Sequence, residues 1–274
     1  MALDLVVGSP PKIDKVATGF GYTAGPVFSR RGYLLFSDVS ANRILQWEGG
    51  NVNAFRENST GATGLTFDHQ GRLLACEQGR VTRTEKDGSI TVLATAFEGA
   101  RLNNPNDLVY AIDGSIYFSV IQARGSAAPG NPALYQIART GELRVASREC
   151  TRPNGVVLAA NQERLFIADT DQRNVRVYEV QGDGSLRNGR IFCEIKGDAS
   201  GGPDGLKTDE SGNVWVAGPG GIWVFDAAGR HLGTVPLPET PSNCAWGAGF
   251  RNLYVTARTS VYRIETKVSG TRTY

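Results

Sequence analysis

The sequence has no long hydrophobic run, few histidines and few cysteines, and each shortage excludes a class of protein. No stretch approaches the roughly 18 apolar residues that a membrane-spanning helix needs. Only two histidines are present, which leaves little material for a Ser-His-Asp triad. The cysteines lie far apart and form no CxxC pair, so they match neither a zinc site nor a disulfide framework. We expect them to be reduced and mostly buried; they stand at positions 76, 150, 193 and 244.

A strong charge of either sign is also missing. Lys and Arg total 29 and Asp and Glu total 27, which gives a net charge of +2. This balance gives no reason to expect nucleic acid or an anionic membrane as a partner. The N-terminal stretch "MALDLVVGSPPKIDKV" has Asp4 inside its only apolar run and no basic start, so it is a poor signal peptide. We expect a cytoplasmic monomer that acts on a small molecule.

Short strand-like runs dominate what is present, and helical periodicity is scarce. The runs are rich in β-branched and aromatic residues, as in "YLLFSD", "SIYFSV", "RLFIADT" and "NVWVAG". The 34 glycines are spread evenly rather than clustered, which indicates many turns and no flexible linker. The composition therefore predicts an all-β protein.

The runs belong to a repeat of six units. The units start with "AGPVF", "TGLTF", "NDLVY", "NGVVL", "DGLKT" and "SNCAW". Their first residues are spaced 39, 43, 48, 50 and 38 positions apart, and these residues are Ala24, Thr63, Asn106, Asn154, Asp204 and Ser242. Each start is followed by a turn such as "DHQGR" or "DESGN" and then by further strands. This spacing indicates about four strands per unit.

Six four-stranded units of this length predict a six-bladed β-propeller, because radial stacking gives the units a shared core and leaves only short edges. We expect the N-terminal segment around "KVATGFGY" to supply a strand to the last blade and close the ring. The whole chain, residues 1–274, would then be one domain. A β-sandwich or a β-helix with irregular insertions is the alternative.

The six unit starts precede the innermost strands, so their side chains would meet near one mouth of the central channel. Asn106, Asn154 and Asp204 carry side-chain oxygens there, and such oxygens suit a hard cation. Asn or Asp before Gly is also a common turn sequence, so "PNG" and "PDG" have a purely structural explanation. Three such residues at one phase of a repeat favour a shared site.

Other residues near the expected mouth have two interpretations each. Trp246, after the sixth unit start, either stacks on a ring-shaped substrate or packs between blades. Arg101 either reaches a substrate group or is a solvated loop residue. Asp169 either faces the channel or forms a turn hydrogen bond. Thr63 belongs to the ring of unit starts and is a candidate substrate contact.

Five segments in order resemble the senescence marker protein, gluconolactonase and luciferin-regenerating enzyme family of six-bladed propellers. They include "GPVFSRRGYLLFSDVSANRI", "RLNNPNDLVYAIDGSIYFS", "RPNGVVLAANQERLFIADT" and "GGPDGLKTDESGNVWVA". The resemblance implies hydrolysis of lactones, often sugar lactones, with one divalent metal, usually calcium, at the top of the channel. It places metal ligands on Asn106, Asn154 and Asp204 and makes Asp204 the catalytic residue. The family's first-blade Glu ligand falls on Ala24, in "AGP" where the family reads "EGP".

The sequence departs from the family pattern at further positions. Gln78 follows "CE" where close relatives often have His, and "FSVI" replaces "FTDP". The loop "QARGSAAPGNPA" that follows looks able to shape a pocket wall. Loss of the Glu should weaken the metal site, because ligand charge tunes cation affinity. Asp107, Asp38 or Glu77 could substitute for it, and Tyr22 could contribute a hydroxyl.

Three functions follow from this pattern. The first is a metal-dependent lactonase with a weakened site that uses Asp204 to position or deprotonate water. The second is metal-poor chemistry in the same pocket, such as a cyclisation or isomerisation, with Asn106 and Asn154 donating to an oxyanion. The third is a binding propeller without catalysis, since this fold supports many functions. Ala24, Gln78 and Asp107 would line the substrate site in the enzymatic cases.

Overall fold

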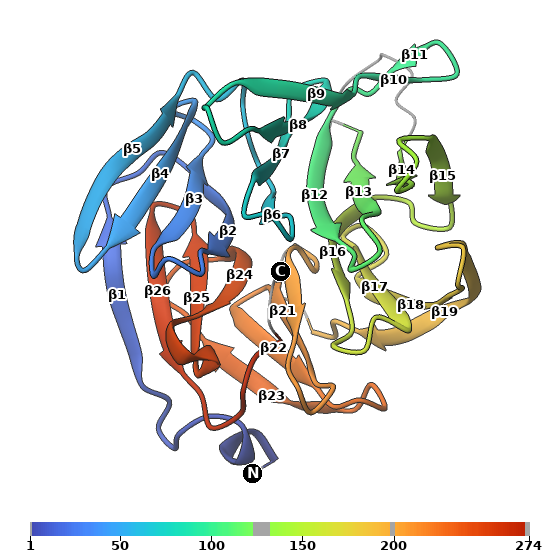
Figure 1. Ribbon diagram of the computed structural model, residues 1–274. Coiled ribbons are helices and arrows are strands. Elements are labelled where there is room, and N and C mark those ends of the chain that lie inside the picture. The colour runs from blue at the N-terminus through green and yellow to red at the C-terminus, as the bar shows by residue number, and fades with distance from the viewer. Residues whose placement is uncertain (1, 123–131, 198–200, 272–274) are drawn as a thin grey trace.

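A computed structural model describes residues 2–122, 132–197 and 201–271. Its strands form six antiparallel four-stranded sheets arranged as blades around a central axis (Figure 1). The predicted six-bladed β-propeller is therefore confirmed. The only helical elements in the described part of the chain are two short 3-10 helices, η1 (Ala2–Leu5) and η2 (Ala248–Phe250).

Each blade takes its strands from one continuous stretch of chain, except that the sixth also uses the N-terminus. Blade 1 consists of β2 (Thr23–Phe28), β3 (Leu34–Asp38), β4 (Arg43–Glu48) and β5 (Asn51–Glu57). Blade 2 consists of β6 (Leu65–Phe67), β7 (Leu73–Glu77), β8 (Arg80–Thr84) and β9 (Ile90–Ala94). Blade 3 consists of β12 (Pro105–Tyr110), β13 (Ile116–Val120), β14 (Ala133–Ile137) and β15 (Leu143–Ser147). Blade 4 consists of β16 (Pro153–Leu158), β17 (Arg164–Asp169), β18 (Asn174–Val180) and β19 (Leu186–Glu194). Blade 5 consists of β20 (Leu206–Thr208), β21 (Val214–Gly218), β22 (Gly221–Phe225) and β23 (His231–Pro236). Blade 6 consists of β24 (Pro241–Gly247), β25 (Asn252–Ala257), β26 (Ser260–Glu265) and the N-terminal strand β1 (Ile13–Thr18). A small hairpin of β10 (Ala96–Phe97) and β11 (Ala100–Arg101) connects blades 2 and 3.

The first strand of each blade lies innermost, as the repeat predicts. Each of β2, β6, β12, β16, β20 and β24 contacts the corresponding strand of both neighbouring blades. The second strand of every blade is buried along its length or nearly so, whereas the outermost strands alternate or are largely exposed. This gradient explains why the inner strands are short apolar runs and the outer ones are more polar.

The hydrophobic core is divided into six clusters, and each cluster fills the space between two neighbouring blades. Between blades 4 and 5, for example, Phe166 and Val175 pack against Val214 and Phe225. Between blades 5 and 6, Trp215 packs against Trp246 with a ring-centroid distance of 5.3 Å. A blade on its own would expose both of its apolar faces, so the blades are stable only as a closed ring.

Both chain ends help to close the ring. Strand β1 pairs antiparallel with β26, from Ile13 opposite Ile264 to Thr18 opposite Ser260, so the N-terminal strand completes the sixth blade as predicted. Glu239, just before β24, accepts hydrogen bonds from Ser260 and Tyr262 at 2.5 and 2.7 Å. Toward the other end of the chain, the Thr271 amide donates to the Thr208 carbonyl at 3.2 Å, which ties this segment to β20 of blade 5.

The cysteines are all free and buried, as predicted. Burial raises the pKa of the Cys150, Cys193 and Cys244 thiols to about 12, so they stay protonated at neutral pH. No helix among the described residues has the length and apolar character needed to cross a membrane.

Candidate functional site

The unit starts converge at one end of the channel, where the blades are joined by direct hydrogen bonds. The Gly64 amide of blade 2 donates to the Asn106 carbonyl of blade 3 at 2.8 Å, and the Gly205 amide of blade 5 donates to the Ser242 carbonyl of blade 6 at 2.8 Å. The Ser242 hydroxyl donates to the Thr23 carbonyl of blade 1 at 2.7 Å. These bonds join neighbouring blades at the end of the inner strands where the unit starts lie.

The glycines after Asn154 and Asp204 serve close packing and not tight turns. Asn154 and Gly155 lie inside β16, and neither Gly155 nor Gly205 has a positive φ. A Cβ atom at Gly155 would lie 2.3 Å from the Asp204 carbonyl oxygen, and one at Gly205 would lie 1.9 Å from Asn243. The turn interpretation of "PNG" therefore does not hold, because the inner strands approach too closely for any side chain there.

Asn154 is held in one orientation by a hydrogen-bond chain. Its Nδ2 donates to Thr170 Oγ1 at 2.9 Å, and that hydroxyl donates to the Pro203 carbonyl at 2.8 Å. The Oδ1 of Asn154 therefore turns the other way and accepts a short hydrogen bond from Asn106 Nδ2. The two amides of blades 3 and 4 thus touch each other at the mouth.

Asp204 and Asp107 place two carboxylates in this small region. Burial, followed by the charge of Asp107, raises the pKa of Asp204 to about 7, although Arg152 and a hydrogen bond with Asn154 act against the rise. Burial also raises the pKa of Asp107, and the Lys207 charge partly offsets it. Asp107 is 3% exposed and accepts hydrogen bonds from the Val156 amide at 3.3 Å and Asn243 Nδ2 at 3.2 Å. Asp107 thus belongs to the channel wall, with its carboxylate bonded to protein groups.

Asp204 interacts electrostatically with Tyr22 and Arg152. Burial and then the Asp204 charge raise the pKa of the Tyr22 hydroxyl to about 12, which keeps it a neutral hydrogen-bond donor. The Arg152 side chain donates to the Gln122 carbonyl at 2.7 Å, and its charge favours the ionised form of Asp204. Sequence reasoning proposed Tyr22 and missed Arg152, although Arg152 directly precedes "PNG" in the chain.

The donor set at the mouth fits a hard divalent cation with few charged ligands. Among the described residues, no three His, Cys, Asp or Glu side chains come together, so a cation would depend on the amide oxygens of Asn106 and Asn154 with the carboxylate of Asp204. The negative charges of Asp107 and Asp204 are unfavourable in the folded protein, and a bound cation would offset them. Ala24 lies buried at the start of β2 and offers no side-chain oxygen.

The acidic residues considered as substitutes for the missing Glu are engaged elsewhere. Asp38 accepts from the Gly21 and Tyr22 amides at 3.1 and 3.2 Å. Glu77 binds Arg56 and Arg80 at 2.6 and 2.7 Å. Both carboxylates anchor their own blades. Asp107 also accepts hydrogen bonds from protein groups, but it is the substitute whose charge acts on Asp204.

Asp169 forms structural hydrogen bonds, as in the second of its two interpretations. It accepts from the Thr151 amide at 2.6 Å and the Arg152 amide at 3.1 Å, and so holds the segment that enters β16. This is the same role that Asp38 has in blade 1, where the segment held is the one that enters β2.

The remaining candidates lie at different depths. The Thr63 hydroxyl donates to the Asn106 carbonyl at 2.7 Å and so braces blade 3. Gln78 and Arg101 are exposed, the first after β7 and the second at the end of β11. Most of the loop expected to shape a pocket wall, at 123–131, lies outside the described residues.

Trp246 packs between blades and does not face the mouth. Its side chain is 4% exposed, and its indole N–H donates to the Thr208 carbonyl at 2.7 Å. Gly270 of the C-terminal segment covers the indole ring. The assignment of Trp246 as a substrate contact is therefore wrong, because no ring face is left for a ligand.

Comparison with known proteins agrees with the sequence resemblance. The profile of the SMP-30/Gluconolactonase/LRE-like region matches residues 22–259. A gluconolactonase from Zymomonas mobilis is 27% identical over 98% of this chain and 85% of its own length. The pentonolactonase XacC of Haloferax volcanii is 28% identical over 81% of this chain and 76% of its own. The solved structure of a gluconolactonase from Xanthomonas campestris superimposes with a TM-score of 0.88, at 27% identity, over 97% of this chain and 92% of that one.

Proposed function

Because the chain belongs to the SMP-30/gluconolactonase/LRE-like family, we propose that it is a lactonase-type hydrolase that opens a lactone or a related cyclic ester. The observation that carries the proposal is the meeting of Asn106, Asn154 and Asp204 at one mouth of the channel, with Asn106 bonded to Asn154 and Asn154 acting on Asp204. The relatives named for gluconolactone and pentonolactone make a sugar lactone the first substrate class to examine.

We assign Asp204 the role of accepting a proton from the attacking water molecule. A carboxylate with a pKa of about 7 is poised to accept a proton near neutral pH. Water would add to the lactone carbonyl carbon as its proton passes to Asp204, and that proton would return to the ring oxygen as the carbon–oxygen bond breaks. The Arg152 charge acts on this carboxylate, and the carboxylate charge acts on Tyr22, which stays protonated; we assign both residues to positioning.

We further propose that a divalent cation, calcium by the family resemblance, is held by Asn106, Asn154 and Asp204. When bound, the cation would polarise the lactone carbonyl as a Lewis acid. The Thr170 hydroxyl supports this assignment, because its bond to Nδ2 of Asn154 leaves the amide oxygen turned toward Asn106. With Ala24 in place of a carboxylate, affinity should be weak by the standard of sites with two carboxylate ligands.

The hydrogen bond between Asn106 and Asn154 also favours a second function. Asn106 presents an N–H, and not an oxygen, to Asn154, and an amide N–H stabilises an oxyanion rather than a cation. This arrangement would suit a metal-independent cyclisation or isomerisation with Asp204 as the proton-transfer group. A binding propeller without turnover is the third possibility.

One set of assays distinguishes these functions. Hydrolysis of glucono-δ-lactone is followed with and without calcium and with EDTA, against the spontaneous rate, for the native protein and Asp204→Asn. Asp87→Asn is the matched control, because Asp87 is an exposed turn carboxylate of blade 2. The metal-dependent lactonase predicts that EDTA abolishes turnover and that Asp204→Asn lowers it by about 100-fold or more.

Each contrary outcome has a clear meaning. Turnover that survives EDTA but not Asp204→Asn supports the metal-independent function. Turnover that is equal in the native protein and Asp204→Asn refutes the role of Asp204. Absence of turnover across sugar lactones with every metal tested leaves the binding function.

A further inference from the structure

A cavity lies between blades 1 and 2, at the opposite end of the inner strands from Asn106, Asn154 and Asp204. It has a volume of about 460 Å³, within the usual range for small-molecule sites. One wall is the turn between β2 and β3, residues 29–33, and the other is the turn between β6 and β7, residues 68–72. Ala24 and Phe28 lie at opposite ends of β2, so this blade 1–2 groove is about 13 Å from the mouth.

The groove carries positive charge that the protein does not neutralise. Arg30, Arg31 and Lys86 are exposed, and within the described part of the chain none of the three forms an ion pair. The groove's two acidic residues, in contrast, are already matched. Arg72 binds Asp68 at 2.7 Å and Glu85 at 3.1 Å. The lining of the groove therefore carries a surplus of positive charge, which favours an anion.

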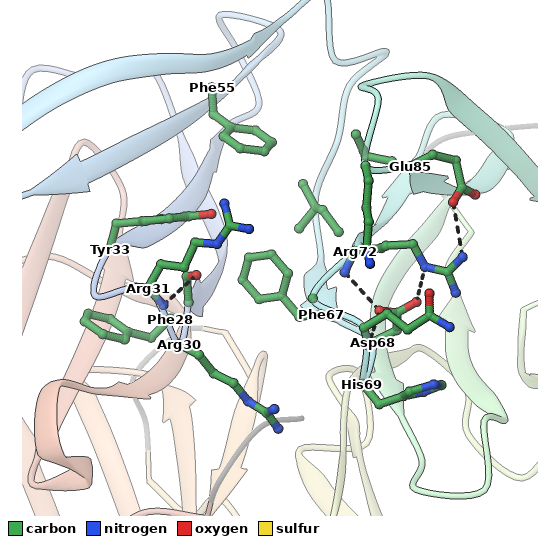
Figure 2. A pocket seen from close by; sticks show the side chains of 16 residues that line it. Phe28, Arg30, Arg31, Tyr33, Phe55, Phe67, Asp68, His69, Arg72 and Glu85 are labelled. Atoms are coloured by element: carbon green, nitrogen blue, oxygen red, sulfur yellow. Dashed lines mark hydrogen bonds and ion pairs between the residues drawn. The ribbon is translucent and has the colours of Figure 1, made fainter.

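Four aromatic side chains also line the groove: Phe28, Tyr33, Phe55 and Phe67. Figure 2 shows Phe55 and Phe67 on either side of a space into which the Arg31 guanidinium points from beside Tyr33, whereas Arg30 points away from it. Phe55, on the outer strand β5, is 38% exposed, so its ring is accessible to a ligand in the groove. A flat ring resting on Phe55 and on the small part of Phe67 that is exposed (7%) would bring an acidic substituent toward Arg31.

The two arginines are not required by the turn that carries them. The turn needs Gly32, whose φ of 95° few other residues adopt, and a hydrogen bond from the Arg31 amide to the Ser29 hydroxyl, which any residue at position 31 could make. Blades 2, 3 and 5 make the corresponding turn with "HQ", "ID" and "ES" in place of "RR". The basic pair is thus a property of this groove and not of the repeat.

We propose that the blade 1–2 groove is a second ligand site, separate from the mouth, for a small organic anion that combines a planar apolar ring with a carboxylate, sulfonate or phosphate group. Arg31 recognises the acidic group, Arg30 and Lys86 add long-range attraction, and Phe55 and Phe67 hold the ring.

The test uses two fluorescent probes of the same shape and different charge. 8-Anilinonaphthalene-1-sulfonate carries the anionic group, and N-phenyl-1-naphthylamine lacks it. Both are titrated into the full-length native protein, Arg31→Gln, Phe55→Ala and the control Arg190→Gln, which removes an exposed arginine from β19 of blade 4. Asp204→Asn is included, so that the groove is tested separately from the proposed activity.

We expect the sulfonate to bind the native protein, Arg190→Gln and Asp204→Asn alike. Arg31→Gln should weaken it about three- to tenfold, as loss of one charged contact predicts, and should leave the neutral probe unchanged. Phe55→Ala should weaken both probes. Both substitutions alter exposed side chains, so the thermal unfolding midpoint should stay at the native value.

Two results overturn the proposal. Equal sulfonate binding by Arg31→Gln and Arg190→Gln would show that the groove does not recognise an anion. Unchanged binding of both probes to Phe55→Ala would show that the ring does not enter the groove. Either result stands whether or not the mouth proves to hydrolyse a lactone.

Discussion

Replacing Asp204 by Asn should change how the stability of the metal-free protein depends on pH. The pKa of the Asp204 carboxyl is raised to about 7, first by burial and then by the charge of Asp107. The folded state therefore holds this proton to a higher pH than the unfolded chain does. The stability that the protonated group contributes is complete below about pH 4 and is lost as the pH rises through about 7. An Asn side chain cannot ionise, so this loss should be missing from the variant.

The size of the effect follows from the difference between the two pKa values. A rise in pKa from 3.8 to about 7 corresponds to roughly 4 kcal/mol, since a tenfold change in proton affinity is worth about 1.4 kcal/mol. Asp204 is only partly buried, and solvent at the mouth screens its charge. We therefore expect about half of this value. Part of this loss occurs below pH 5, so between pH 5 and pH 8.5 the native protein should lose about 1 kcal/mol relative to Asp204→Asn.

Urea unfolding in EDTA at a series of pH values measures this difference, because the free energy of unfolding is obtained at each pH by linear extrapolation. Asp87→Asn is the control, since an exposed carboxyl is ionised in both states throughout this range. Adding calcium to the native protein should reduce the loss at high pH, because a cation bound only to the folded state opposes the repulsion. Parallel pH profiles for the native protein and Asp204→Asn would refute the electrostatic description of the mouth.

Three further predictions concern the ring and its mouth. Glu239→Gln should lower the free energy of unfolding by about 2 kcal/mol at pH 7, because hydrogen bonds from Ser260, Thr259 and Tyr262 outweigh burial and lower the Glu239 pKa to about 2. In urea unfolding, the difference between the native protein and the variant should shrink as the pH falls from 4.5 toward 2. A difference that stays constant with pH would contradict this. Gly155→Ala should lower the free energy of unfolding by about 3 kcal/mol and reduce turnover, because its Cβ would meet the Asp204 carbonyl, whereas the control Gly182→Ala has no atom within 4 Å to meet. Ala24→Glu should tighten calcium binding by about tenfold or more in calorimetry, because it adds a carboxylate to the mouth; equal affinities would show that position 24 does not face the cation.

The sequence alone was enough to establish the fold and the closure of the ring. Strand pairing within a blade joins neighbours in the chain, so strand length, turn residues and the repeat period all appear in local stretches. The same periodicity aligned Asn106, Asn154 and Asp204 at one phase of the repeat, and it identified "KVATGFGY" as the strand that completes blade 6.

Only the tertiary structure decided what lies between the blades, since those contacts join residues about 40 or more positions apart and depend on how closely the inner strands approach. It showed that Gly155 is a packing glycine within a strand, and that Trp246 is a core residue. It also brought Arg152 to Asp204, and turns of two blades together as the groove beside Arg31. Local patterns report hydrogen bonding along the chain, whereas burial, pKa and cavity shape are set by neighbours that only the closed ring supplies.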